Sequence, residues 1–396
     1  MTAPRKVPPF DLIGPNGVRD LRSRSDPTHL EAQCGFVPGD AMNLPVRRPQ
    51  FSPDSVYLNT PTYGLAAASV VEVITEALDK WRKGIATMAE YDEAVTRSRR
   101  LFAEIVRADP TRVAVANQTS VFVGVVASSL REGSVVLAPE GDFTSLLFPM
   151  LVQDGRGITL RTAALGDLAA AIDRNTDMVA FSLVQSADGR QADVDAVLEA
   201  AARHGAMTLV DATQAAGWLP IEASRFDYMV VSAYKWLLCP RGTAFMTMGS
   251  GSDEEMSPIL AGWYAGEDPW RSVYGTPLRL AESARRFDVS PAWLPWMGSV
   301  PALEIIAGHG VDAIHRHDRA LADSARVRLG MEPTGSAIVT VPLSDTATLT
   351  ERGISASLRS SNVRVGFHLY NDRTDVDALV EAVTASSTNG LGHGSV

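Results

Sequence analysis

Four side chains of different chemistry follow two short apolar runs near the middle of the chain. The first run ends at Asp211, and Gln214 follows one turn later. The second run, residues 228–231, is followed by Ser232 and then by Lys235. Runs of small and β-branched residues are typical of buried strands. An acid, an amide, a hydroxyl and an amine are therefore expected at two strand ends.

This set of groups is what pyridoxal phosphate (PLP) requires from a protein. The PLP aldehyde reacts with a lysine amine, and a carboxylate beside the pyridine nitrogen keeps the ring protonated and able to accept electrons. Aromatic residues flank Lys235 on both sides, which indicates burial. A buried lysine has a lowered pKa and becomes nucleophilic. An ordinary structural lysine is the alternative, and the presence of Asp211 and Gln214 upstream argues against it.

The elements that would position these residues alternate along the chain. Strands separated by helices predict an α/β fold with a mostly parallel seven-stranded sheet, covered on both faces. Ligands of such sheets bind beyond the carboxyl ends of the strands, where Asp211 falls. The predicted strands are 113–116, 134–138, 157–161, 177–184, 206–210, 227–232 and 243–248, and the predicted helices are 66–83, 90–107, 119–131, 144–153, 166–173, 193–204 and 213–217.

Two domains are predicted between two irregular ends. Residues 1–54 are rich in proline and predict an arm that is partly extended or disordered. Residues 55–293 form the predicted large PLP-binding α/β domain. Residues 294–386 read as a small α+β domain, to which the N-terminal segment contributes. Residues 387–396 predict a disordered tail.

Composition excludes several classes of function. The net charge is −10, from 36 basic and 46 acidic residues, and no basic stripe offers a surface for nucleic acid or for an anionic membrane. Two cysteines, Cys34 and Cys239, are too few for a disulfide framework, and the histidines lack metal-ligand spacing. The sequence contains no long apolar run and no signal-peptide pattern. A cytoplasmic protein without a metal is therefore expected.

The central motif resembles a known family. Asp-Ala-Thr-Gln at 211–214, followed by Ser-Ala-Tyr-Lys-Trp-Leu-Leu-Cys-Pro-Arg-Gly-Thr-Ala-Phe at 232–245, is similar to the class V aminotransferase group of fold-type I PLP enzymes. That group includes cysteine desulfurases, isopenicillin N epimerase-like proteins and C–S lyases of the ergothioneine type. The resemblance covers roughly 55–385 and implies PLP as cofactor and a homodimer with shared active sites.

The resemblance also implies a role in cofactor binding for each matching residue. Lys235 would form the Schiff base and shuttle the proton, Asp211 would pair with the pyridinium nitrogen, and Gln214 would hydrogen-bond the ring oxygen. The other implied contacts are Ser232, Gln118 and Thr119 at the phosphate, Phe143 or, in a shifted register, Asp142 against the ring, and Ser290 at the partner's phosphate. Plain N-capping of the helix that begins at 119 remains the alternative to phosphate binding there, and core packing remains the alternative for Phe143.

Five further residues are expected near the substrate. Arg364 matches the arginine that binds the substrate α-carboxylate, a task that suits a planar guanidinium because it holds both oxygens. Gln185 and Ser186 match a stretch near the ring or the substrate. Asn59 ends a short strand and is either a substrate contact or the start of a turn. His368 shares a strand face with Arg364 and is either a supporting group or a structural histidine.

Two departures from the family pattern narrow the expected reaction. No cysteine follows Cys239, so a desulfurase that forms a persulfide is disfavoured, and Phe143 stands where desulfurases carry a histidine. The sequence favours a PLP enzyme that acts on an amino acid through an external aldimine and Cα deprotonation, with β-elimination of the C–S lyase type as its reaction. An aminotransferase or an epimerase is the alternative, and an inactive PLP-fold interaction protein is a minor one.

Overall fold

The computed structural model describes residues 50–252, 254, 256–359 and 361–389. Almost all of the predicted arm at 1–54 lies outside the described residues, as does the end of the predicted tail from residue 390. Helix α11, Arg373–Asn389, continues into the first residues of that predicted tail. No helix among the described residues is both long enough and apolar enough to cross a membrane.

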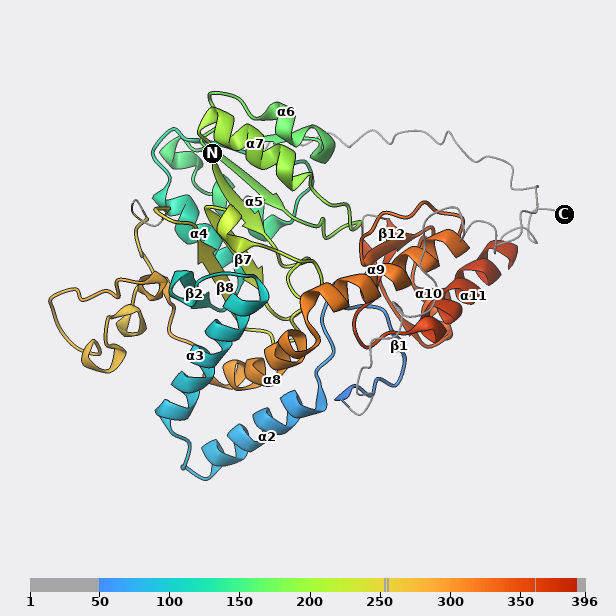
Figure 1. Ribbon diagram of the computed structural model, residues 1–396, viewed down its shortest axis with the longest axis horizontal. Helices are drawn as coiled ribbons and strands as arrows, with labels where there is room; N and C mark the ends of the chain where they lie inside the picture. The colour runs from blue at the N-terminus through green and yellow to red at the C-terminus, as the bar shows by residue number, and fades with distance from the viewer. Residues whose placement is uncertain (1–49, 253, 255, 360, 390–396) are drawn as a thin grey trace, which may run out of the picture. The chain divides into compact units, whose positions relative to one another are not determined.

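A seven-stranded sheet forms the centre of the fold (Figure 1). Its strand order is β2-β8-β7-β6-β5-β3-β4, and all neighbouring pairs are parallel except the two that involve β8. The predicted α/β fold with a mostly parallel sheet is therefore confirmed. The strands are β2 Val113–Ala116, β3 Val135–Pro139, β4 Thr159–Ala163, β5 Met178–Ser182, β6 Met207–Asp211, β7 Tyr228–Ser232 and β8 Ala244–Met248.

Helices cover both faces of this sheet. Alternate residues of a strand point to opposite faces, and the chain is apolar at both sets of positions. Val210 and Phe245 pack into one core with α3, α6, α7 and α8, whereas Leu209 and Met246 pack into a second core with α4 and α5. These helices are α3 Met88–Ile105, α4 Thr119–Ser129, α5 Thr144–Leu151, α6 Leu168–Ala171, α7 Val194–His204 and α8 Trp293–His309.

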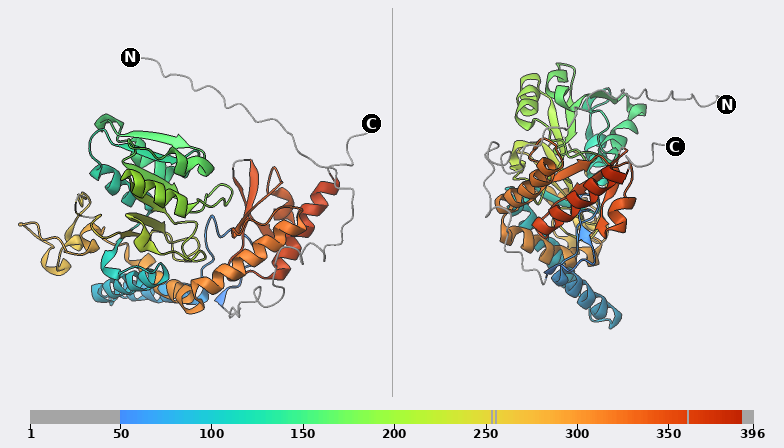
Figure 2. Two further views of the ribbon diagram at one scale, coloured as in Figure 1. Left: turned by 45° about the horizontal axis from the view of Figure 1, so that its top comes forward. Right: turned by 90° about the vertical axis from the view of Figure 1, so that its right-hand side faces the viewer.

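The C-terminal part builds a second, smaller layer beside the large sheet (Figure 2). Three antiparallel strands, in the order β11-β12-β9, pack with α9 and α11. β1 Val56–Tyr57, from the start of the described chain, pairs with β10 Ile354–Ser355 in this region. The remaining elements are α2 Ala68–Arg82, α9 Val311–Arg328, β9 Ile338–Val341, α10 Ala347–Glu351, β11 Ser357–Arg359 and β12 Asn362–Gly366.

The predicted helix at 213–217 is wrong. This segment forms overlapping turns, in which Ala212 O accepts hydrogen bonds from the N–H groups of Ala215 and Ala216. Gly217 then adopts φ +112°, a value that favours glycine. A Cβ at this position would lie 2.4 Å from Trp236 O. The close approach holds the segment after β6 against the segment after β7.

Candidate functional site

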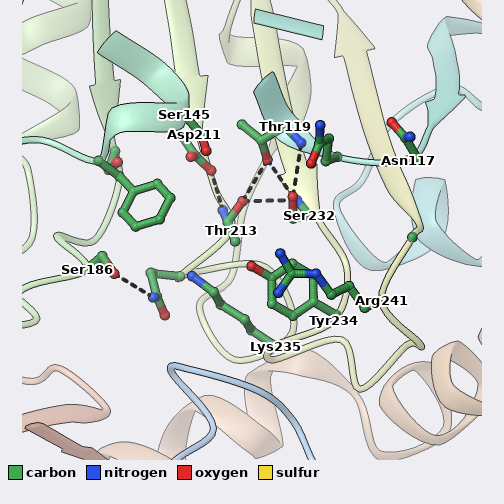
Figure 3. Close-up of a pocket in the computed structure, with 15 residues that line it drawn as sticks. Asn117, Thr119, Ser145, Ser186, Asp211, Thr213, Ser232, Tyr234, Lys235 and Arg241 are labelled. Atoms are coloured by element: carbon green, nitrogen blue, oxygen red, sulfur yellow. Dashed lines mark hydrogen bonds between the residues drawn. The ribbon is translucent and has the colours of Figure 1, made fainter. Parts of the chain in front are cut away.

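The ends of β6 and β7 meet at one cavity, because these strands are parallel neighbours. Asp211 is the last residue of β6, and Lys235 lies three residues beyond the end of β7. The cavity holds about 260 Å³ (Figure 3). It is lined by Asn117, Gln118, Thr119, Phe143, Ser145, Ser182, Ser186, Asp211, Thr213, Gln214, Ser232, Tyr234, Lys235, Arg241 and Gly242.

Lys235 has a strongly perturbed amine group. Its side chain is buried, and burial lowers the pKa of its amine to about 7. The negative charge of Asp211 acts in the opposite direction, whereas the guanidinium groups of Arg364, Arg359 and Arg241 lower the pKa of Lys235 further. A large share of the amine is therefore neutral near pH 7, as an amine nucleophile requires.

Asp211 presents a carboxylate to the cavity. Burial raises the pKa of Asp211, and a hydrogen bond from the backbone N–H of Thr213 to Oδ1 (2.8 Å) opposes this shift. A hydrogen bond with the Thr213 side chain opposes the shift as well. A cationic ring N–H that binds this carboxylate would stabilise its charged form. The geometry fits a protonated pyridine.

Three hydroxyl groups gather at the opposite end of the cavity from Ser186 (Figure 3). Ser232 Oγ accepts a hydrogen bond from Thr119 N (3.0 Å) and lies 2.8 Å from Thr119 Oγ1. Thr213 Oγ1 accepts from Ser232 N (2.9 Å) and lies 3.2 Å from Thr119 Oγ1. Gln118 is the N-cap of α4, and its side chain does not cap the helix. Hydroxyl groups and a helix N-terminus together suit a phosphate.

Phe143 and Asp142, the two candidates for the position beside the ring, point to different places. Phe143 lines the cavity, and its ring centroid lies 5.4 Å from Lys235 Nζ. Asp142 is buried and accepts hydrogen bonds from Ser182 N (2.9 Å) and Gln185 Nε2 (3.0 Å). Asp142 thus fixes the end of β5, and of these two residues Phe143 is the one that faces the cavity.

Gln214 links the cavity to distant segments. Its Nε2 donates to Pro61 O (2.9 Å) and to Ser186 Oγ (3.0 Å), and its Oε1 accepts from Trp236 Nε1 (2.9 Å). Both amide hydrogens are therefore used within the chain. A ring oxygen bound by Gln214 would take the place of Ser186 as acceptor.

Arg364 is a buried guanidinium without a carboxylate partner among the described residues. It donates to the Ser186 carbonyl, to Ser186 Oγ (3.1 Å) and to Thr62 Oγ1 (2.8 Å), and more weakly to Ser357 Oγ (3.3 Å). Its Nε is buried and has no partner there. Burial, followed by the charge of Arg359, lowers the pKa of Arg364 to about 9. A substrate carboxylate would supply the missing negative charge.

Five of the predicted site residues do not line the cavity, and Arg364 is one of them, although it donates hydrogen bonds to the lining residue Ser186. The side chain of Gln185 donates a hydrogen bond to Asp142, as described above. Asn59 O starts a turn by accepting from the backbone N–H groups of residues 62 and 63, which matches its alternative interpretation. Ser290 is exposed on the single chain, so a contact with phosphate would require a second subunit. The fifth is His368.

His368 has a structural position. It is fully buried, with Nδ1 2.8 Å from Asp318 Oδ2 and Nε2 3.0 Å from the carbonyl oxygen of Trp236. Burial lowers the pKa of His368 to about 3 and raises the pKa of Asp318 well above its ordinary value. A neutral imidazole that donates from Nε2 holds the backbone directly after Lys235. Together with Asp318, His368 connects the segment just after β12 to the loop that carries Lys235.

Sequence reasoning gave no site role to seven residues that line the cavity. Thr213 lies inside the Asp-Ala-Thr-Gln motif, and its position between two named site residues was an available signal. Tyr234 and Arg241 flank the lysine motif, and Ser145 follows Phe143 closely. Asn117 lies just after β2, Ser182 ends β5, and Gly242 lies just before β8. Each of them lies at, follows or precedes a strand end, which is where side chains of an α/β sheet reach its ligand.

Comparisons with known proteins agree with this geometry. Isopenicillin N epimerase of Streptomyces clavuligerus is 29% identical over 312 residues, which cover 71% of this chain and 76% of that protein. A probable cysteine desulfurase of Pasteurella multocida is 29% identical over 248 residues, 55% of this chain and 58% of that protein. The solved complex of the cystine C–S lyase C-DES with cysteine persulfide has a TM-score of 0.76 at 20% identity and covers 83% of this chain and 97% of that chain.

The family model of the class-V aminotransferases matches residues 57–353. The matched segment contains the whole seven-stranded sheet together with Asp211 and Lys235. The cysteine desulfurase CsdA of Escherichia coli shares the fold, with a TM-score of 0.72 at 20% identity over 93% of this chain and 100% of that chain. The chain therefore belongs to the class-V aminotransferase family of fold-type I, PLP-dependent enzymes.

Proposed function

We propose that this enzyme cleaves a bond at Cβ of an amino-acid substrate by β-elimination, as a lyase of the C–S lyase type. The observation that carries the proposal is the acid–base content of the cavity. Lys235 is the only amine that lines it, and no imidazole or thiol lies among the described lining residues. Elimination needs one base at Cα and no protein nucleophile.

Several residues fit the cofactor. Asp211 would hold the pyridine N–H, Phe143 would lie against the ring, and Thr119, Thr213 and Ser232 would bind the phosphate. Bound PLP supplies the electron sink that makes the Cα–H bond acidic. The aromatic side chain of Phe143 offers packing to the ring but transfers no proton. Proton transfer therefore falls to the lysine.

The substrate would be held by its carboxylate and deprotonated on the side of the lysine. Arg364 has its Nε without a partner and would bind the α-carboxylate. Lys235 would take the proton from Cα, because burial keeps much of its amine neutral near pH 7. In elimination, the electrons of the Cα–H bond expel the leaving group from Cβ, and Lys235 can return the proton to that group.

The thiol in the described chain argues against a persulfide-forming desulfurase. Cys239 is buried, and burial raises the pKa of its thiol to about 12. Its sulfur lies 3.5 Å from Leu237 O, away from the residues that line the cavity. A thiol that stays protonated and buried is a poor nucleophile. Cys34 lies outside the described residues.

Epimerisation is the second candidate, because the isopenicillin N epimerases of Streptomyces clavuligerus and Amycolatopsis lactamdurans are each 29% identical to this chain. Transamination shares the same first step, the removal of the Cα proton, and remains a further alternative. Among the described residues that line the cavity, there is no second amine or imidazole to transfer a proton on the side of the cofactor ring where Phe143 would lie. An epimerase built this way would have to use Lys235 for both proton transfers.

The protein is further proposed to act in the cytoplasm as a homodimer, in which the exposed Ser290 reaches the partner's phosphate. Sedimentation of the purified enzyme would measure its state of association. A monomer that binds PLP with full affinity would contradict this part of the proposal. An inactive PLP-fold protein is a minor alternative, since Lys235, Asp211 and Arg364 together make a complete set of reactive groups.

The test is to incubate the PLP-loaded enzyme with cysteine conjugates and other amino acids, with and without a keto acid. Elimination from cysteine-type substrates yields pyruvate and ammonia without any keto-acid acceptor. A strict requirement for the keto acid would instead establish transamination. Exchange of the Cα hydrogen with inversion and no cleavage would establish epimerisation. The Lys235→Ala variant serves as the control for cofactor-only chemistry.

A further inference from the structure

We propose that Arg241 binds the phosphate group of the cofactor and supplies the positive charge that the rest of the phosphate end lacks. Arg241 lines the cavity that contains Lys235. It is the only arginine among the described lining residues. The inference rests on PLP as the cofactor, and it does not depend on which reaction the enzyme performs.

The sheet register brings Arg241 to the phosphate end. Ala244, the first residue of β8, pairs with Ala116 at the end of β2 and with Ser232 at the end of β7. Because both pairs are antiparallel, the residues just before Ala244 lie beside those just after Ala116. The register therefore directs Arg241 toward the start of α4, and Arg241 and Thr119 line the same cavity. In Figure 3, Arg241 is on the same side of the cavity as Thr119 and Ser232.

The loop that carries Arg241 is fixed at both ends. Cys239 N donates to Ala233 O (3.1 Å), Ala233 N donates to Thr243 O (3.0 Å), and Thr243 Oγ1 donates to Pro240 O (2.9 Å). Gly242 has φ +105°, a value that favours glycine and turns the chain into β8. The loop is thus held against the lysine motif, and only the side chain of Arg241 is left to adjust.

The guanidinium of Arg241 is positioned by an aromatic ring. Its Cζ lies 4.9 Å from the centroid of the Tyr234 ring, in a cation–π arrangement. The side chain is exposed and has no acidic partner among the described residues. Stacking on a ring face leaves the N–H groups at the edge of the guanidinium available to an anion. The Tyr234 ring thus positions the Arg241 guanidinium and leaves its N–H groups available to bind an anion.

The negative charge of a bound phosphate requires a positively charged side chain at this end of the cavity. A phosphate monoester carries about −1.5 to −2 charges near pH 7, whereas Asn117, Gln118, Thr119, Thr213 and Ser232 are all neutral. The N-terminus of α4 contributes about half a positive charge. Arg364, by contrast, is joined to Ser186, on the other side of Lys235. Arg241 is the cation within the described cavity that matches the phosphate.

The experiment compares the binding of PLP and of pyridoxal, which has the same aldehyde and ring but no phosphate. Dissociation constants are measured on the cofactor-free full-length protein from the visible absorbance band that forms on binding. Arg241→Gln is expected to weaken PLP binding by about tenfold, as loss of a charge-assisted hydrogen bond does. Pyridoxal binding should change by less than about twofold, because the variant leaves the ring contacts intact.

Two further variants complete the design. Arg241→Lys keeps the charge and should recover part of the lost PLP affinity. Arg100→Gln removes an exposed arginine on α3 and serves as the matched control, with no effect on either ligand. Affinity of the wild-type protein for PLP should fall with added salt more steeply than that of Arg241→Gln. Equal weakening of PLP and pyridoxal in Arg241→Gln, or no weakening of either, would overturn the proposal.

If the wild-type protein binds neither PLP nor pyridoxal, the assignment of the cofactor fails, and the inference about Arg241 fails with it. If PLP binds and the Arg241 variants behave like the wild-type protein, only the inference fails. Inorganic phosphate gives an independent measurement, since it should compete with PLP for the wild-type protein and compete less well for Arg241→Gln. Equal competition in both proteins would contradict a phosphate contact.

Discussion

The two ends of the cavity are built in opposite ways. At the phosphate end, Thr119, Thr213 and Ser232 are neutral groups that hydrogen-bond to one another and lie at, or just beyond, the ends of strands of one sheet. Beside Ser186 at the other end, Arg364 is charged and buried, and its partners include Ser186 and Thr62, which are distant in the chain.

Because of this difference, the two ends should gain different amounts of binding free energy from their ligands. The hydroxyl cluster satisfies its own hydrogen bonds before the phosphate binds, so its contribution to affinity is a modest net exchange of hydrogen bonds. Arg364 is buried without a counter-charge among the described residues, which lowers the pKa of its guanidinium to about 9. A carboxylate relieves that unfavourable state. Substitutions at the two ends should therefore differ in size and in which ligand they affect.

The largest effect is expected at Lys235, which lies between the two ends. Lys235→Ala removes the amine that we propose both reacts with PLP and acts as the base, so turnover should fall by about 10⁴-fold or more. The yellow band of the lysine-bound cofactor should disappear as well. Steady-state assays and absorbance spectra check both outcomes. Lys83→Ala, at the exposed end of α2, is the control, and turnover within tenfold of wild type in Lys235→Ala would refute the assignment.

The next largest effect is expected for Arg364→Gln. Loss of a charge-assisted contact should raise KM for the amino acid by about 10- to 100-fold. PLP affinity should stay unchanged, because the phosphate end remains intact. Saturation kinetics and a PLP titration separate the two quantities, and Arg352→Gln at an exposed position is the control. A loss of PLP affinity with an unchanged KM would reverse the assignment of the two ends.

The pH dependence of PLP uptake should report on the lysine itself. Because burial, reinforced by three guanidinium groups and opposed by Asp211, lowers the pKa of Lys235 to about 7, the protonated and unreactive amine dominates only below that pH. The uptake rate should fall by about tenfold per pH unit below 7 and level off above about 8. Stopped-flow absorbance measures this rate. Pyridoxal, which has no phosphate to titrate, should give the same profile, and a rise that continues to pH 10 would indicate a solvated lysine.

The smallest effect is expected for Thr213→Val. This change removes one neutral hydroxyl and should weaken PLP binding by about three- to tenfold, as the loss of a neutral hydrogen bond does. KM for the amino acid should stay within about twofold of wild type. The PLP titration measures the first effect, and Thr384→Val on exposed α11 is a matched control. A larger effect on PLP than that of Arg241→Gln would mean that the hydroxyl cluster, and not the arginine, dominates phosphate binding.

Much of the fold could be predicted, because buried strands are marked by continuous apolar runs. Strand β2 lies at the predicted residues, and β5 and β8 lie within the predicted ranges. The predicted helix at 213–217 failed for a tertiary reason. Gly217 must approach Trp236, and the hydrogen bond from Thr213 N to Asp211 starts a turn after β6.

For the site as well, the local sequence predicted some residues correctly, and tertiary packing decided the others. Asp211, Ser232 and Lys235 share one short motif, and two parallel strand ends bring them together. Gln185 and His368 match the family stretch in sequence, yet their side chains are used elsewhere, at Asp142 and at Asp318. Sequence spacing gives the strand face of a residue, and packing decides whether the side chain reaches the cavity.

By itself, the sequence determined the sheet, the lysine and the carboxylate, because local runs of apolar residues specify strands and the polar residues that follow them lie at strand ends. Only the tertiary structure decided which charges lie at each end of the cavity. Arg241 and Arg364 are far apart in the chain, and the family resemblance assigned a role to Arg364 alone. The antiparallel register of β8 brings Arg241 to the phosphate end, and the pairing of β12 with β9 and β11 buries Arg364 at the other. Long-range strand pairing, which no local pattern encodes, is the physical reason.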